Sequence, residues 1–246
     1  MKFADDNMLG YGTAHRSFSS GDALILDAGY RRAHLPLVNS LHPDVIHEDG
    51  DYRMGTYTAE RYSLVLPICD ERLRQTSTFI EFENALRKAP FSEKINWNLP
   101  EKRKNLLHAT ICSGLHQEDI ETHTRALQKF INVQPSKRYR LGGVFMGTVN
   151  TGRVYFKVYP EASGAGHAFG EIQSQLGFKD THFFLVGYFN LTDHLDEAET
   201  EALCSILCHF RDETFWEDNL TELWVISTQD DLVLSGRILK KIVRFA

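Results

Sequence analysis

The stretch that decides the fold is Asn105-Leu-Leu-His-Ala-Thr-Ile-Cys-Ser-Gly-Leu115. Its apolar residues, followed by the turn signal Ser113-Gly114, predict a buried β-strand. Because side chains alternate across a strand, His108 and Thr110 project from the same face. A group that can transfer a proton therefore lies beside a hydroxyl that can bind an anion. The alternative for a single motif of this kind is a core histidine bonded to a neighbouring carbonyl.

The residues around this stretch predict a unit of strand, helix, strand and helix. Arg61–Ile68 is typical of a buried strand, and Asp70 is a candidate N-cap for a helix that Pro90 ends. The strand with His108 follows, and a second helix is predicted over residues 117–132.

The second half of the chain predicts the same order of elements. The expected elements are strands at 141–147 and 153–159, a helix from Pro160 to about Leu176, a strand at 181–190 that begins near His182, a helix at about 196–210, and terminal strands around 223–226 and 242–245. The two halves differ in sequence, so only the order of elements and the position of the histidine repeat.

This repetition predicts an α+β fold of two similar lobes, each an antiparallel sheet backed by helices, around a central cleft. The lobes are expected at roughly residues 60–135 and 140–215 of a domain that spans residues 56–246. Residues 1–55 are expected to form an N-terminal extension. That extension either packs across the main domain or forms a lid over a site.

Composition and charge argue against several classes of binding partner. The net charge of -6 over 246 residues argues against a general coat on nucleic acid and against binding to double-stranded DNA. No apolar run approaches the roughly 20 residues that cross a bilayer, and the first ten residues lack the core of a signal peptide, so we expect no membrane partner and a cytoplasmic location. The four cysteines are expected to be ordinary core residues, and no metal site is predicted.

A pseudo-two-fold arrangement of the lobes would bring His108 and His182 face to face across the cleft. Cleavage of a cyclic phosphate requires two such groups, one to take a proton from the attacking water and one to protonate the leaving oxygen. Neighbouring hydroxyls can bind the non-bridging oxygens as charge builds on them.

At these residues the sequence resembles the 2H phosphoesterase superfamily, whose members carry one His-x-Thr/Ser motif in each lobe. Tyr62-Ser-Leu-Val-Leu-Pro67, Trp97-Asn-Leu-Pro100 and Leu107-His-Ala-Thr-Ile111 are similar to the first lobe of that family. The resemblance covers roughly residues 60 to 215. It implies RNA 2′,3′-cyclic phosphodiesterase or RNA ligase-like activity, with His108 and His182 as the catalytic pair.

The second motif departs from the family pattern, because Phe184 stands where the family has Thr or Ser. Tyr188, further along the same face of the predicted strand, is the candidate to supply the missing hydroxyl. His194 is the fallback for the second histidine, with a solvated turn as its alternative.

Further candidates flank these motifs. Lys157 and Tyr155, together with Arg153, either line the cleft and bind phosphate or form a solvent-facing side of their strand. The basic run Lys102-Arg103-Lys104 is interpreted as a solvated turn.

Two functions therefore stay open, besides a scaffold in which both histidines are structural. The leading hypothesis is a metal-independent, cofactor-free phosphoesterase that hydrolyses a 2′,3′-cyclic phosphate or a related phosphodiester of a small nucleotide or RNA end. The alternative is a binding module for nucleotides or RNA ends that retains the cleft but has lost one catalytic motif.

Overall fold

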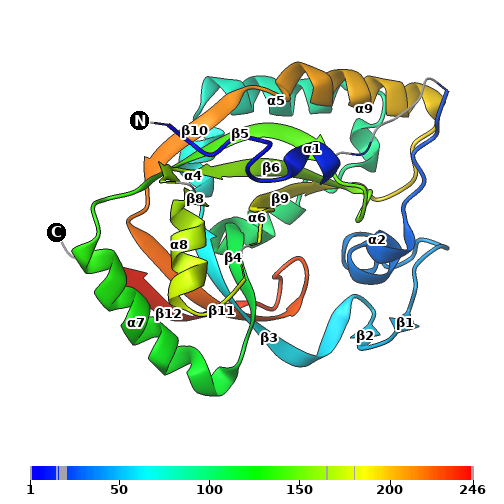
Figure 1. Cartoon of the computed structure of the whole chain (residues 1–246). Coiled ribbons are helices and arrows are strands. Elements are labelled where there is room, and N and C mark those ends of the chain that lie inside the picture. The colour runs from blue at the N-terminus through cyan, green and yellow to red at the C-terminus, as the bar shows by residue number, and fades with distance from the viewer. Residues whose placement is uncertain (1, 15, 17–20, 165, 180, 245–246) are drawn as a thin grey trace.

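The computed structural model describes residues 2–14, 16, 21–164, 166–179 and 181–244, and these form two antiparallel sheets with helices packed against them (Figure 1). The first sheet contains β1 (Glu48–Asp49), β2 (Tyr52–Arg53), β3 (Thr56–Pro67), β4 (His108–Leu115), β11 (Glu222–Asp230) and β12 (Arg237–Val243). The second sheet has the order β10 (Thr214–Asn219), β5 (Arg138–Met146), β6 (Arg153–Pro160) and β9 (Leu185–Asn190). A small hairpin joins β7 (Ala162–Ser163) to β8 (Gly166–His167).

Three short helices precede the first strand, and the remaining helices lie between strands. The helices are α1 (Tyr11–Ala14), α2 (Ala28–Ala33), α3 (Leu35–Val38), α4 (Asp70–Arg74), α5 (Ser77–Lys88), α6 (Leu99–Arg103), α7 (Ile120–Val133), α8 (Ala168–Gln175) and α9 (Glu197–Phe210). Short 3₁₀ turns lie at Ser92–Lys94, Lys104–Leu106 and Gln117–Asp119. No helix in the described part of the chain is both long and apolar enough to cross a membrane.

Each half of the sequence contributes a helix that packs against elements of the other half. In the first half, α5 packs against α9 and β10 of the second sheet, whereas α8 from the second half packs against α7 and β4 (Figure 1). One continuous apolar core therefore joins both sheets. The predicted α+β fold with two antiparallel sheets backed by helices is confirmed.

The two sheets meet where β4 of the first lies beside β9 of the second. In the first sheet, β3 has β4 on one side and β11 on the other, so the C-terminal strands complete the sheet that carries His108. This placement follows from the alternation of β4. Ala109 and Ile111 enter the common core, so His108 and Thr110 are left on the opposite face.

Residues of the N-terminal extension cover the second sheet. The amide of Ala4 donates to the carbonyl of Pro160, and the hydroxyl of Tyr11 lies 2.9 Å from the carbonyl of Val158. Leu24 forms an isolated antiparallel bridge with Leu195. Every residue of β6 is buried. The solvent-facing alternative for its polar face was therefore wrong, because cover comes from residues more than a hundred positions away.

Three predicted elements differ from the structure. Asp70 does not cap one long helix, because α4 and α5 are separate and Thr76 accepts a hydrogen bond from the amide of Phe79 at the start of α5. No helix begins at Pro160, because the β7–β8 hairpin precedes α8. The strand expected from Thr181 begins only at Leu185. The last residue of the expected strand 242–245, Phe245, lies outside the described residues.

Candidate functional site

His108 and Thr110 lie together in a recess at the seam between the sheets. The Nδ1 of His108 is 2.6 Å from the carbonyl of Leu106. A carbonyl only accepts hydrogen bonds, so Nδ1 carries the proton of the neutral ring and Nε2 is left as an acceptor. The Thr110 side chain is half-buried and lines the same recess. The predicted pair of a proton acceptor and a hydroxyl is therefore present on one face of β4.

Two buried arginines share this recess. Arg103, at the end of α6, donates from Nε to the carbonyl of Leu232 (2.5 Å) and from Nη1 to the carbonyl of Gly187 (2.8 Å). Arg153, the first residue of β6, donates to the carbonyls of Asp231 (3.2 Å) and Gly187 (3.4 Å). Its Nε is buried and has no hydrogen-bond partner. Neither guanidinium forms an ion pair with a carboxylate in the described part of the chain.

The opposing strand carries neither a histidine nor a hydroxyl at this position. Leu185 and Gly187 of β9 line the cavity across from His108 and Thr110. A Cβ atom at position 187 would overlap the Arg153 guanidinium, so the absence of a side chain there makes room for the arginine.

The cavity consists of two pockets that share lining residues. The inner part, about 210 Å³, is lined by both arginines, Tyr155 and the exposed side chain of Phe183. The outer part, about 390 Å³, extends along β3 and β4 past Tyr57 and Tyr62. His108, Thr110, Asp231 and Val233 line both parts. Together they are large enough for a ligand of nucleotide size.

Burial and like charge shift the pKa values of the groups in the cavity. Burial lowers the pKa of His108 to about 4; the Leu106 carbonyl opposes this shift and the two arginines add to it. Burial, and then the charge of Arg153, lowers the pKa of Arg103 to about 9. Burial also raises the pKa of the Asp231 carboxyl, which accepts hydrogen bonds from Tyr52 (2.8 Å) and Tyr57. At neutral pH the recess therefore presents a neutral imidazole and two guanidinium cations, beside the carboxyl of Asp231 that accepts from two tyrosine hydroxyls.

The structure does not bring His182 to this recess. His182 is exposed, precedes β9 and lies near Gly10, whereas its neighbour Phe183 reaches the cavity. Phe184 is fully buried and packs against Phe169, with ring centroids 4.8 Å apart. It therefore occupies a core position and does not stand in for the hydroxyl of a second motif.

Of the other predicted residues, Tyr155 lines the cavity and Tyr188 and Lys157 do not. The hydroxyl of Tyr188 donates to Asp70 (2.5 Å) on the core side of β9. Lys157 is fully buried and its ammonium binds the carboxylate of Asp6, 2.9 Å away. Both side chains are committed to structural contacts, so neither is a ligand for the His108 recess.

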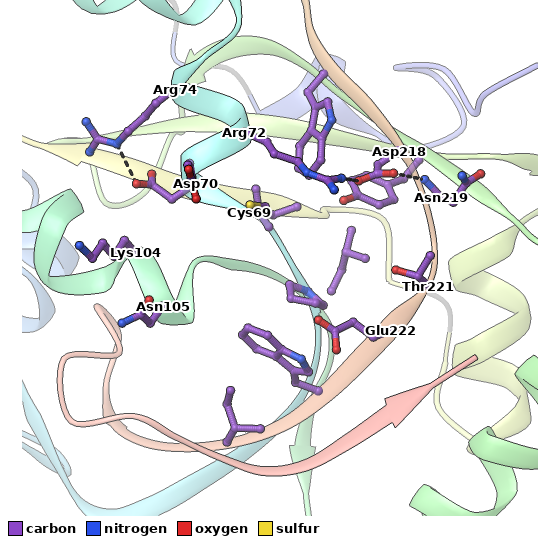
Figure 2. Close-up of a pocket in the computed structure, with 18 of the residues that line it drawn as sticks. Cys69, Asp70, Arg72, Arg74, Lys104, Asn105, Asp218, Asn219, Thr221 and Glu222 are labelled. Atoms are coloured by element: carbon purple, nitrogen blue, oxygen red, sulfur yellow. Dashed lines mark hydrogen bonds and ion pairs between the residues drawn. The ribbon is translucent and has the colours of Figure 1, made fainter. Parts of the chain in front are cut away.

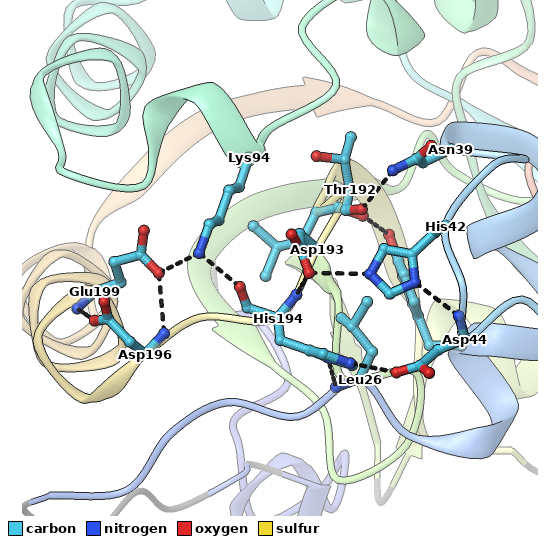
Figure 3. Close-up of polar contacts among 12 residues, drawn as sticks. Leu26, Asn39, His42, Asp44, Lys94, Thr192, Asp193, His194, Asp196 and Glu199 are labelled. Atoms are coloured by element: carbon cyan, nitrogen blue, oxygen red, sulfur yellow. Dashed lines mark hydrogen bonds and ion pairs between the residues drawn. The ribbon is translucent and has the colours of Figure 1, made fainter.

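His194, the fallback second histidine, belongs to a different cluster (Figure 3). Its Nδ1 accepts from the amide of Leu26 (2.9 Å) and its Nε2 is 2.7 Å from Asp44. His42 is arranged similarly, with Nδ1 accepting from the amide of Asp44 and Nε2 3.0 Å from Asp193. Because a backbone amide occupies each Nδ1, each ring carries its proton on Nε2 and donates it to a carboxylate. This cluster connects the extension to the loop after β9.

The sequence did not point to two residues of the site, Asp231 and Gly187, and it suggested the wrong environment for a third, Arg103. Arg103 is 3% exposed, so the interpretation of residues 102–104 as a solvated turn was wrong for this residue. The sequence feature that could have indicated its burial is the apolar pair Leu99-Pro100, which is buried in the same helix, α6. Asp231 and Gly187 gave no local signal, because their place in the site depends on β11 and β9 approaching β4. Across the described ranges, no cluster of three or more histidine, cysteine or acidic residues is arranged to hold a metal ion.

No family model and no curated protein matches this sequence. Among solved structures, the chain is similar to the crystal structure of TT0787 from Thermus thermophilus, with a TM-score of 0.45 and 12% sequence identity. That alignment covers 74% of this chain and 97% of the other. A likeness this remote carries no argument about activity, so the evidence for function comes from the recess itself.

Proposed function

We propose that the His108 recess binds a phosphate group of a small nucleotide or an RNA end, and that the protein acts as a binding module for such ligands. The observation that carries this proposal is the pair of buried guanidiniums without a carboxylate partner among the described residues. Guanidinium groups match the geometry of phosphate oxygens, and hydrogen bonds to charged groups are the strong ones. An anion between Arg103 and Arg153 would relieve the repulsion that lowers the pKa of Arg103.

The remaining groups fit the same ligand. The Thr110 hydroxyl, which lines the cavity, is a donor from which a phosphate oxygen can accept. Tyr57 and Tyr62 line the outer part of the cavity, where aromatic rings can contact a base or sugar.

A second candidate is hydrolysis of a 2′,3′-cyclic phosphate with His108 as the base. The observation that favours it is the neutral ring with Nε2 as an acceptor, which is the form that takes a proton from water. Two guanidiniums would stabilise the charge that builds on the phosphate. A second histidine, His116, lines the outer part of the cavity but not the inner part that holds the two arginines, so we expect slow turnover at most.

Calorimetric titration with a 2′,3′-cyclic mononucleotide, followed by product analysis, separates the candidates. We expect saturable binding that Thr110→Val weakens by about 10- to 150-fold, since a hydrogen bond to a charged group contributes about 1.5–3 kcal/mol. His182→Ala is the matched control and should bind as the wild type does. If turnover occurs, His108→Ala should lower its rate by about 10²–10⁴. If neither binding nor turnover is observed, the two arginines have only a structural role and the proposal is contradicted.

A further inference from the structure

A second cavity, of about 900 Å³, lies apart from the His108 recess and shares no lining residue with it. It is a groove between the end of β3 with α4 on one side and β10, β11 and β12 on the other. Figure 2 shows Lys104 and Asn105 on one side of this groove and Thr221 and Glu222 on the other. Its volume is at the upper end of the range for small-molecule sites.

Aromatic side chains from three strands form the apolar part of the groove. Trp216 of β10 and Trp224 of β11 are half-buried, so each leaves part of its ring accessible. Tyr139 of β5 is buried and fixes Trp216 by an edge-to-face contact, with ring centroids 5.9 Å apart at 82°. The indole Nε1 of Trp224 is buried without a hydrogen-bond partner. The groove therefore offers flat rings for stacking.

The cations around the groove differ in whether a carboxylate neutralises them. Arg72 pairs with Asp218 at 3.2 Å and Arg74 with Asp70 at 2.7 Å, as Figure 2 shows. Lys104 pairs with Glu101.

Lys241 has no carboxylate partner among the described residues. It is exposed, faces Trp224 across the β11–β12 pair, and its ammonium is 5.2 Å from the ring centroid of that tryptophan. Among the described residues of the groove, Lys241 is therefore the cation without a carboxylate partner, and it lies beside the ring of Trp224.

The charged side chains that line the groove argue against a long polyanion as its ligand. Five acidic side chains line the groove, and a nucleic-acid strand would bring its phosphates close to them; they are Asp70, Glu71, Glu101, Asp218 and Glu222. A ligand with a single anionic group can place that group beside Lys241. The carboxylates and the amides of Asn105 and Asn219 are suited to accept from or donate to sugar hydroxyls.

We infer that this groove binds a mononucleotide. Its base stacks on the tryptophans, its sugar hydroxyls bond the acidic and amide side chains, and its phosphate lies at Lys241. This site is independent of the His108 recess, so either can fail without the other.

The test uses adenosine 5′-monophosphate on the full chain and reads out alkylation of Cys69. Cys69 and Cys208 are both exposed thiols, but only Cys69 lines the groove, so Cys208 is an internal control. We expect the nucleotide to protect Cys69 and leave Cys208 reactive. Quenching of tryptophan fluorescence should saturate over the same concentrations, because Trp216 and Trp224 are two of the three tryptophans in the chain.

Exposed Lys241 gives a variant that should fold normally. Lys241→Met should weaken the monophosphate about tenfold and leave binding of adenosine unchanged, since only the phosphate contact is lost. Trp224→Leu should abolish quenching by both. Equal reactivity of Cys69 with and without nucleotide, or unchanged affinity in Lys241→Met, would overturn the inference. Loss of Cys69 protection in His108→Gln would overturn it too, because the nucleotide would then occupy the other cavity.

Discussion

Gly187 determines where the Arg153 guanidinium lies. Any side chain at this position would occupy the space of the guanidinium, and the carbonyl of Gly187 accepts from both Arg103 and Arg153. One residue of β9 therefore positions both cations of the recess. The far end of an arginine is flexible, so a methyl group here displaces the guanidinium more readily than it unfolds the sheet.

Gly187→Ala should therefore weaken binding of a cyclic phosphate by at least about tenfold, because Arg153 leaves its place, while the midpoint of thermal unfolding falls by only a few degrees. Calorimetry and a thermal melt measure the two effects. Gly12→Ala is the matched control, since a Cβ atom there meets nothing within 4 Å. Equal affinities for Gly187→Ala and the wild type would contradict the assigned role of Arg153.

The pKa of His108 predicts how binding depends on pH. In the free protein that pKa is about 4, and a bound anion would raise it. Binding therefore takes up a proton between the free and the bound pKa values. The affinity for a phosphodiester, whose own charge is constant, should rise about tenfold from about pH 8 to about pH 5.

Calorimetric titrations at a series of pH values test this, with His108→Gln as the variant that should show a flat profile. A wild-type affinity that is constant across the range would mean that the anion does not approach the imidazole.

At the scale of elements, the N-terminal extension keeps the polar face of β6 out of water. Lys157 is fully buried, and Asp6 supplies both its ion pair and an acceptor 2.6 Å from the hydroxyl of Tyr159. Removing the carboxylate would leave a buried ammonium without its partner, which is more costly than losing an exposed pair.

Asp6→Ala should therefore lower the free energy of unfolding by about 2–3 kcal/mol, as measured by urea denaturation. Glu101→Gln, which removes the exposed pair with Lys104, should change it by less than about 0.5 kcal/mol. Similar losses in both variants would show that the extension does not seal this face.

The same elements show what the sequence could and could not predict. The strand of His108 and Thr110 follows from local alternation, which is set within the strand itself. The polar face of β6 looked solvent-facing because its cover comes from residues 4–11, which no local pattern reveals. The second histidine was misplaced because strand β9 starts three residues after His182. A site assembled from β4, β6, β9, α6 and the β11–β12 turn is set by long-range packing.

At the scale of the whole molecule, the His42 and His194 cluster connects the N-terminal extension to the loop between β9 and α9. The hydrogen bond from His194 lowers the pKa of Asp44 below its usual value. A carboxyl whose folded pKa is lowered contributes stability above its unfolded pKa and loses it as pH falls through the folded value. This contribution is therefore complete above about pH 4 and is lost below it.

Asp44→Asn should flatten the acid limb of a plot of stability against pH and leave its shape above about pH 5 unchanged. Urea denaturation at closely spaced pH values measures both limbs. An unchanged acid limb in the variant would mean that the cluster does not contribute to acid stability.

The central claim is that Arg103, Arg153 and His108 together bind a phosphate group. The most direct test is an NMR titration of their side chains, following the Nε–H signals of the two arginines and the imidazole of His108 as a 2′,3′-cyclic mononucleotide is added. We predict that all three signals shift and saturate along one binding curve. Three unmoved signals at ligand concentrations up to about 10 mM, where even a weak complex is populated, would contradict the claim.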